Sequence, residues 1–294
     1  MRPTPADAER FRGCVEAQLG IHFDRRKQDM LRDVLALRCE AHGMSPSSYL
    51  AQLVADPGFD EGPLAAELTV GETYFFRNRD QFDALVEIAA GRALDIVSAG
   101  CASGEEPYSI AIALRGVSPA IRAFDINPEA LRRATRARYS MWSLRETSPA
   151  ACERWFVSAG KHVELADEIR NAVRFERANL LDPATWPAAS CDVVFCRNVL
   201  MYFRPEVMAS VVRAIAGALR PGGYLFLGHA ETLRGISDDF ELCHSHGTFY
   251  YARRPGRAIV RSDDSWHRSI QEASERVREL AEREEAPAAP PPDV

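Results

Sequence analysis

The chain has 294 residues, 46% of them hydrophobic, which is enough for one large or two modest domains with a substantial core. Its formal net charge of −6 argues against a nucleic-acid-binding protein, which would carry a basic field. No apolar stretch approaches the ~18 residues of a membrane span, and residues 1–14 contain acids and no apolar segment, so neither membrane insertion nor a signal peptide is expected.

The cysteines are scattered singly and form no CxxC pair, a pattern typical of a reduced cytoplasmic protein with buried thiols. They number seven: Cys14, Cys39, Cys101, Cys152, Cys191, Cys196 and Cys243.

Residues 1–75 are predicted to form an all-helical domain. Apolar residues recur at three- and four-residue spacing in 7–20 and 25–43. Segment 45–56 opens with Ser-Pro, a helix-start signal, and the helical pattern continues in 63–76. Short breaks containing Gly or Pro separate these segments, so we expect several short helices.

From about residue 92 the pattern changes to alternating strands and helices. Strands are predicted at 92–100, 120–127, 191–198 and 223–230, and helices at 106–116, 128–139 and 204–223. This alternation predicts a parallel sheet with helices on both faces. Segment 239–254 is predicted to form two strands around a Gly-containing turn, which would add an antiparallel strand at the sheet edge.

Two segments depart from the alternation. Residues 154–178 are predicted to be a small strand-rich insertion in a sheet domain that spans 76–256. Residues 257–294 are expected to form a charged helix followed by a disordered, Pro-rich end.

The loop after the first predicted strand carries Gly100 and Gly104 in the spacing G-x-x-x-G. Glycines there let backbone N–H groups approach a ligand at the carboxyl ends of the strands. The spacing is not the dinucleotide fingerprint G-x-G-x-x-G. Glu105 and Glu106 follow directly, and acids at a helix N-terminus would repel a pyrophosphate but tolerate a cationic ligand.

The second predicted strand ends at Asp125, where an acid is placed to accept hydrogen bonds from ribose hydroxyls. A nucleoside with a positive charge and no phosphates fits both features, and S-adenosylmethionine (SAM) is such a molecule. Two alternatives stay open: the glycines serve only the turn, and Asp125 serves only as the cap of the helix from 128.

Four motifs together resemble the CheR family of chemotaxis-receptor glutamate methyltransferases, over about residues 10–253. They are GETYFFR (71–77), SGEEPYSIA (103–111), FCRNVLMYF (195–203) and GYLFLGHAET (223–232). The resemblance implies an α/β fold with the Rossmann-like sheet of class I SAM-dependent methyltransferases, an N-terminal helical domain and a small inserted β-subdomain.

The resemblance also implies roles for particular residues. Arg77 and Tyr202 are expected at the methyl-transfer site, with Arg77 also on the cofactor side. The cofactor-binding residues are expected to be Thr73, Arg77, Gly100, Glu105, Glu106, Asp125, Asn179, Leu180, Arg197 and Asn198. Which of the two glutamates contacts SAM stays open.

Several other residues have simpler interpretations. Phe75, Phe76, Phe195 and Phe203 are expected in the core, and Cys196 is expected to be a small buried hydrophobe. His244 and His246 share a face of a predicted strand, but no third ligand is in view, so no metal is expected.

The implied substrate is a glutamate in the cytoplasmic methylation helices of transmembrane chemoreceptors, so a cytoplasmic location is expected. Segment 25–43 carries Arg and Lys residues diluted by acids, and it suits a docking surface or a solvated face equally well. The inserted segment has only a short loop, 158–164, so we expect that a receptor-tail pentapeptide is not required. A SAM-binding signalling scaffold and a transferase for a small carboxylic acid are the rival hypotheses.

Overall fold

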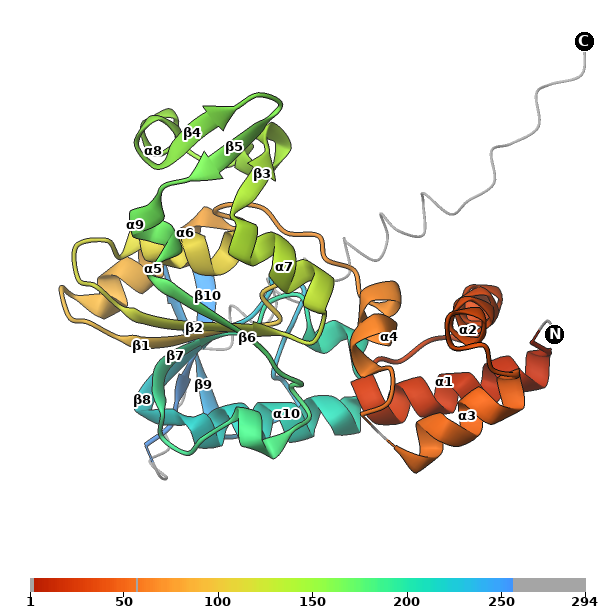
Figure 1. The fold of residues 1–294 in the computed structure, drawn as a ribbon. Helices are drawn as coiled ribbons and strands as arrows, with labels where there is room; N and C mark the ends of the chain where they lie inside the picture. Colours follow the sequence, from red (N-terminus) through yellow and green to blue (C-terminus); the bar gives the residue numbers. More distant parts are fainter. Residues whose placement is uncertain (1–2, 57, 256–294) are drawn as a thin grey trace, which may run out of the picture. The chain divides into compact units, whose positions relative to one another are not determined.

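The computed structural model describes residues 3–56 and 58–255, without the side chain of Arg25 (Figure 1). The predicted charged helix and Pro-rich end at 257–294 therefore lie outside the described residues. The described chain belongs to one contact unit, Met1–Pro255, so a domain division near residue 75 stays a prediction.

Four helices form the N-terminal part of the chain. They are α1 (Pro5–Leu19), α2 (Gln28–His42), α3 (Pro46–Ala55) and α4 (Glu61–Leu68), with a 3₁₀ turn η1 (Arg25–Lys27) before α2. Thr4 and Asp7 form a capping box at the start of α1, and the Ser45 hydroxyl accepts the N–H of Ser48 at the start of α3. The apolar faces of these helices bury a common core that includes Phe11, Leu35, Tyr49, Leu50 and Leu64.

A buried carboxylate ties three of these helices together. The Asp60 side chain accepts two hydrogen bonds from Arg38 at 2.7 and 2.8 Å and one from the Tyr49 hydroxyl at 2.5 Å. The His42 Nε2 atom lies 3.0 Å away. Burial raises the pKa of Asp60, but the hydrogen bonds from Arg38, Tyr49 and His42 outweigh it, so the net pKa is lowered.

The rest of the described chain is built on a seven-stranded sheet in the order β6-β2-β1-β7-β8-β10-β9. Its strands are β1 (Asp95–Ala99), β2 (Ala120–Asp125), β6 (Val173–Arg177), β7 (Cys191–Phe195), β8 (Leu219–Phe226), β9 (Phe240–Ser245) and β10 (Thr248–Arg253). The first five strands of this order are parallel, and β10 runs antiparallel to β8. The chain adds β2 on one side of β1 and later returns to add β7 on the other, which makes a topological switch point beside β1.

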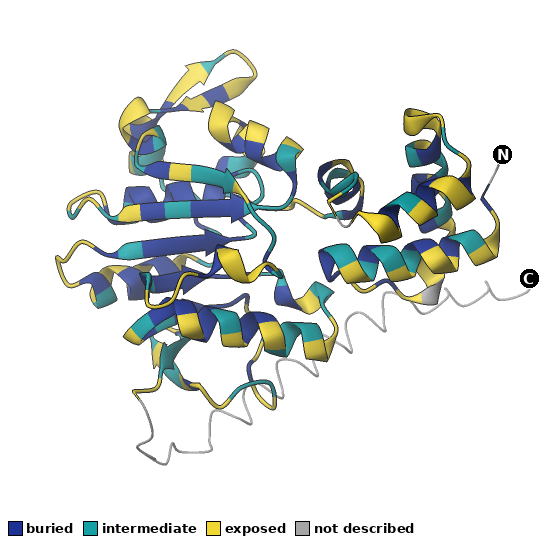
Figure 2. Ribbon diagram, turned by 60° about the horizontal axis from the view of Figure 1, so that its bottom comes forward, coloured by how far each residue is buried: buried dark blue, intermediate teal, exposed yellow. Residues whose placement is uncertain are grey.

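Helices cover both faces of this sheet (Figures 1 and 2). They are α5 (Arg79–Ala89), α6 (Glu105–Ala113) and α7 (Pro128–Arg136) on one face and α10 (Pro205–Ala218) on the other. Alternate strand residues enter two separate cores: Ile96 and Ala123 pack with α5 and α6, whereas Val97 and Phe124 pack with α10. The predicted parallel sheet with two covered faces is confirmed, and α5 lies in a segment for which no element is predicted.

The inserted subdomain begins and ends earlier in the chain than the predicted range 154–178. Its strands are β3 (Arg138–Ser140), β4 (Phe156–Ala159) and β5 (His162–Leu165), antiparallel in the order β3-β5-β4. Between them lie η2 (Met141–Leu144) and α8 (Pro149–Trp155), and α9 (Asp167–Arg170) follows β5. Strand β6 lies within the predicted insertion but pairs with β2 at the edge of the main sheet. Because an edge strand lacks a continuous apolar run, its sequence does not distinguish it from the strands of the insertion.

The predicted helix at 204–223 is too long. The helix α10 ends at Ala218, and β8 begins at Leu219 and passes through Pro221–Gly223. The register between β7 and β8 shifts between Cys191 and Val193, and a Cβ on Gly223 would lie 2.8 Å from the Asp192 carbonyl oxygen. This glycine therefore allows a β-bulge and does not stop the helix.

Candidate active site

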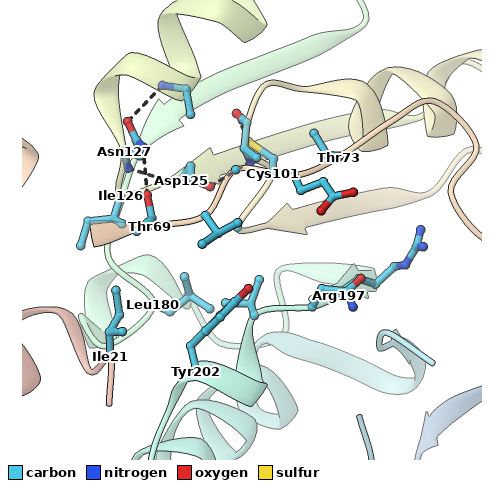
Figure 3. A pocket seen from close by; sticks show the side chains of 18 of the residues that line it. Ile21, Thr69, Thr73, Cys101, Asp125, Ile126, Asn127, Leu180, Arg197 and Tyr202 are labelled. Carbon is cyan, nitrogen blue, oxygen red and sulfur yellow. Dashed lines mark hydrogen bonds between the residues drawn. The ribbon is translucent and has the colours of Figure 1, made fainter. Parts of the chain in front are cut away.

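A cavity lies at the carboxyl ends of β1, β2 and β7, beside the N-terminal helices (Figure 3). All the predicted cofactor and catalytic residues except Glu105 line it. Further lining residues come from the N-terminal helices and their connections: Leu19, Ile21, His22, Phe23, Lys27 and Leu68. The site is thus built from the N-terminal helical part of the chain together with the loops at the carboxyl ends of the strands.

The glycine loop after β1 is held tightly against the neighbouring strand. The N–H groups of Gly100 and Cys101 donate to the Phe124 carbonyl at 2.9 and 3.1 Å. Gly100 has φ +72°, and a Cβ there would lie 2.5 Å from Val199. Gly104 has φ +91° and faces Ala134 of α7, away from the cavity. Gly100 therefore serves the cavity, and Gly104 serves the packing of the loop on α7.

Asp125 fixes this loop from the end of β2. Its carboxylate accepts the N–H of Ala102 at 2.9 Å and that of Asn127 at 2.8 Å, and it lines the cavity. Burial raises the pKa of Asp125, and these backbone donors oppose the shift. The cap of α7 is Asn127, which accepts from Glu129 and Ala130, so the alternative role of Asp125 as that cap is wrong.

The two glutamates of the acidic pair point to different places. Glu105 is buried away from the cavity, accepting from the hydroxyls of Ser103 at 2.7 Å and Ser143 at 3.4 Å. Glu106 lines the cavity, accepts from Ser98 at 2.8 Å and lies 3.4 Å from Arg197. Burial raises the pKa of Glu106, and the Arg197 charge opposes this.

Arg197 is a buried cation in the cavity wall. Its Nη2 donates to the Arg77 carbonyl at 2.5 Å and to Asn78 Oδ1 at 2.7 Å, whereas its Nε has no partner and is buried. Burial lowers the pKa of Arg197, and Glu106 opposes the shift. A buried guanidinium with an unpaired N–H beside a carboxylate matches the opposite charges of an amino-acid tail.

The segment around Arg77 is anchored by its aromatic residues. Phe75 and Phe76 are buried, as is Phe195, which confirms that these three belong to the core. Phe203 is only partly buried and lines the cavity. The Arg77 Nη1 donates to the Glu72 carbonyl at 3.1 Å.

Asn179 lies at the junction between the sheet and the N-terminal helices. Its amide N–H₂ donates to the Gln18 carbonyl at 2.9 Å and to Glu61 at 3.1 Å, and its oxygen accepts the N–H of Leu181. Leu180 is buried beside it and lines the cavity. The apolar Leu180 side chain, more than the amide of Asn179, is free to contact a ligand.

Tyr202 extends into the cavity from the 3₁₀ turn η4 (Leu200–Tyr202) (Figure 3). Its carbonyl accepts the His22 N–H at 2.8 Å, and Ile21 and Phe203 form an isolated antiparallel bridge. The backbone of the N-terminal part therefore supports the segment that carries Tyr202.

Glu231 lies in the motif at 223–232 but is not among the predicted site residues. Its carboxylate accepts four backbone N–H groups, from Asn198 at 2.7 Å, Gly228 at 2.8 Å, Val199 at 3.0 Å and Met201 at 3.2 Å. Asn198 has φ +57°, a left-handed conformation that is costly outside glycine. Glu231 thus holds a strained segment between Arg197 and Tyr202.

Within the described part of the chain, no three His, Cys, Asp or Glu side chains are grouped so that they could hold a metal ion. His246 lies in the β9–β10 turn with φ +52° and pairs with Glu87, not on the strand with His244. Among the helices of residues 3–56 and 58–255, none combines the length and apolarity needed to cross a bilayer.

The parallel sheet, its switch point, the glycine loop and the acid that ends β2 define a class I methyltransferase fold with a nucleoside pocket. The family model "CheR methyltransferase, SAM binding domain" matches residues 71–249. The chain therefore belongs to the CheR methyltransferase family and is a SAM-dependent methyltransferase.

Several proteins are similar to the chain over most of its length. Chemotaxis protein methyltransferase 2 of Vibrio cholerae is 32% identical over 280 residues, covering 88% of this chain and 97% of that one. Chemotaxis protein methyltransferase 1 of Pseudomonas aeruginosa is 33% identical over 278 residues, covering 86% and 100%. An uncharacterised 104.1 kDa protein of Rhodobacter capsulatus is 34% identical over 230 residues; the match covers 72% of this chain but 24% of that longer protein.

Proposed function

We propose that this protein transfers the methyl group of SAM to glutamate side chains of chemoreceptors, forming methyl esters and S-adenosylhomocysteine. The observation that carries the proposal is the cavity that combines the Glu106–Arg197 pair, the strand-end Asp125 and the inward-pointing Tyr202. Membership of the CheR methyltransferase family supports methyl transfer from SAM as the reaction of this cavity.

The side chains of the cavity fit SAM. Glu106 suits the ammonium group of its amino-acid tail, and the positive charge of the neighbouring Arg197 suits the tail carboxylate. Asp125 suits the ribose hydroxyls, and Ile126 and Leu180 offer apolar surface for adenine. When bound there, SAM supplies a methyl group on a positively charged sulfur.

The reaction needs no general base to deprotonate the nucleophile, which is the carboxylate of the substrate glutamate. A glutamate side chain has a pKa near ~4.3, so it is ionised at neutral pH. The residues around the cavity have to orient and partly desolvate that carboxylate. Arg77 can pair with it through its guanidinium, and the Tyr202 hydroxyl can donate one hydrogen bond to it.

We further propose that the substrate lies in the cytoplasmic methylation helices of transmembrane receptors, and that the enzyme works in the cytoplasm without a receptor-tail pentapeptide. The turn between β4 and β5 consists of Gly160 and Lys161 alone, which leaves little loop to cover a bound peptide. Calorimetric titration with such a pentapeptide should show no binding, and micromolar affinity would overturn this part.

The reaction is tested by incubating the purified protein with radiolabelled SAM and receptor-enriched membranes. We expect label in the receptors that is released as methanol by mild base, which is diagnostic of a methyl ester. Binding of SAM without transfer would favour a signalling scaffold instead. Labelling of small carboxylic acids but not of receptors would favour a small-molecule transferase.

A further inference from the structure

An exposed aromatic and basic surface adjoins the rim of the cavity. We call it the Trp142 surface and define it as Tyr74, Arg133, Met141, Trp142 and Arg145. The cavity wall is itself exposed here, since Val70 lines the cavity and is 69% exposed.

The Trp142 surface is connected to the cavity by a stack of rings and guanidinium groups. Tyr74 lines the cavity, and the guanidinium carbon of Arg145 lies 3.5 Å from its ring centroid. The same carbon lies 4.6 Å from the centroid of Trp142, and Arg145 also donates to the Trp142 carbonyl at 3.0 Å. The Phe75 N–H donates to the Ser143 carbonyl at 2.9 Å, which joins η2 to the segment that carries Tyr74 and Arg77.

The apolar residues of this surface are held out to solvent. Trp142 is 72% exposed and Met141 is 64% exposed. Tryptophan is usually well buried, and tryptophan and arginine dominate the binding energy of protein interfaces. A tryptophan held by a stacked arginine is a rigid anchor for a partner.

The Trp142 surface itself carries two arginine side chains, Arg133 and Arg145. Arg133 reaches to within 3.7 Å of the position of a Gly71 Cβ at the cavity wall, and Arg145 lies 4.0 Å from the exposed Glu72. The chain as a whole carries a net charge of −6. Two arginines beside one exposed glutamate leave this surface positive on an acidic protein, which favours an acidic partner.

Helix α2 offers less free charge than its sequence suggests. The Arg38 guanidinium is engaged by the buried Asp60, and Arg32 lies 3.5 Å from Asp29 on the same helix. These pairs reduce the attraction that α2 can exert on an acidic partner. The Trp142 surface adds Arg133 and Arg145 to the basic side chains that a substrate with carboxylates can meet.

We propose that the Trp142 surface docks the substrate helix while its glutamate enters the cavity. This inference rests on the proposed function. An apolar residue three or four positions from the reacting glutamate packs on Trp142, and a neighbouring acid of the same helix pairs with Arg145. The preferred substrate is thus a helix with additional acids and an apolar residue one turn from the methylated site.

The test compares Trp142→Ala with the wild type in methylation of receptor-enriched membranes. We expect the KM for receptor to rise about tenfold, as for a hot-spot residue, with kcat and the Kd of S-adenosylhomocysteine within about twofold of wild type. Val54→Ala removes an apolar side chain that is 72% exposed on α3, and it should change none of these values. Arg145→Gln should flatten the dependence of KM on salt.

Each outcome decides the matter. An unchanged KM in Trp142→Ala would overturn the docking surface while leaving the proposed function standing. If the wild type binds S-adenosylhomocysteine but methylates no receptor, the proposed function and the docking surface both fail. If sedimentation shows that Trp142→Ala dissociates a dimer with KM unchanged, the surface belongs to a second copy, and the proposal is overturned.

Discussion

At the scale of single residues, the polar side chains of the cavity are oriented mainly by backbone groups. Asp125 is held by the amides of Ala102 and Asn127, and Arg197 by the Arg77 carbonyl. Such contacts fix side-chain positions before any ligand arrives, which lowers the entropic cost of binding and of reaching the reactive geometry.

Tyr202→Phe should slow methyl transfer to receptor by about 10- to 100-fold, the worth of one hydrogen bond to a charged group. Arg77→Ala should slow it at least as much, because a guanidinium pairs with a carboxylate through two bonds. Initial rates with labelled SAM measure the effect, and circular dichroism checks the fold. Wild-type rates for both variants would remove these residues from the reaction.

Glu231→Gln should reduce methyl transfer by about tenfold or more. The substitution keeps the shape of the side chain, but whichever way the amide turns, its N–H₂ faces two backbone donors that were accepted before. The strained backbone at Asn198 then loses its support, and the neighbouring Tyr202 shifts.

Glu241→Gln is the matched control, because Glu241 is exposed on β9 and should tolerate the change. Combining Glu231→Gln with Tyr202→Phe should give less than the sum of the two losses, because both act through the same hydroxyl. Full additivity would show that Glu231 does not act through Tyr202.

The sequence motifs led to Arg197, Tyr202 and Asp125, but not to the supporting role of Glu231. The difference is physical. An acid at the end of a strand can be recognised from its place in a repeating βα pattern. Glu231 instead accepts hydrogen bonds from amides such as that of Val199, about 30 positions away in the chain. Only the folded sheet brings these groups together. The sequence could not show which of Glu105 and Glu106 lines the cavity, because this depends on the orientation of α6 in the folded protein.

At the scale of elements, the central strands were predictable because they are buried on both faces and form continuous apolar runs. The edge strand β6 and the three short strands β3 to β5 lack that signal, so the limits of the insertion were misplaced. The start of β8 was hidden because Pro221 and two glycines usually end a helix, and here they form a bulged strand.

Gly100→Ala should destabilise the protein by about 1–3 kcal/mol, since the residue has φ +72° and a new methyl group would collide with Val199. It should also weaken S-adenosylhomocysteine binding. Gly217→Ala provides the contrast, because Gly217 lies within α10 with open space around it, so the variant should gain up to ~1 kcal/mol. Urea unfolding and calorimetry measure both effects. Equal stability of the two variants would contradict the strain at the glycine loop.

At the scale of the whole molecule, the stability of the fold should depend on pH through Asp60. Its pKa in the folded protein is lowered, so its contribution is complete above the unfolded value of ~3.9 and is lost as the pH falls through the folded pKa. Asp60→Asn should cost roughly 3 kcal/mol at pH 7, as expected when one partner of a buried ion pair is removed.

The difference in unfolding free energy between Asp60→Asn and the wild type should shrink in acid below about pH 4. Asp167→Asn serves as the reference, because Asp167 is exposed and pairs only within one turn. A gap between Asp60→Asn and wild type that stays constant from pH 7 to pH 3 would contradict the assignment.

The backbone contact of His22 with Tyr202, beside the bridge between Ile21 and Phe203, joins the connection after α1 to the segment that lines the cavity. The N-terminal helices cannot be regarded as a detachable module that merely recruits substrate. In a chimera that carries the N-terminal helices of a distant relative, the backbone contact with Tyr202 would be mismatched. We expect such a chimera to turn over more slowly, even with a substrate that the N-terminal helices do not bind. Divergence within this family should therefore preserve the seam between the two parts more strictly than their outer surfaces.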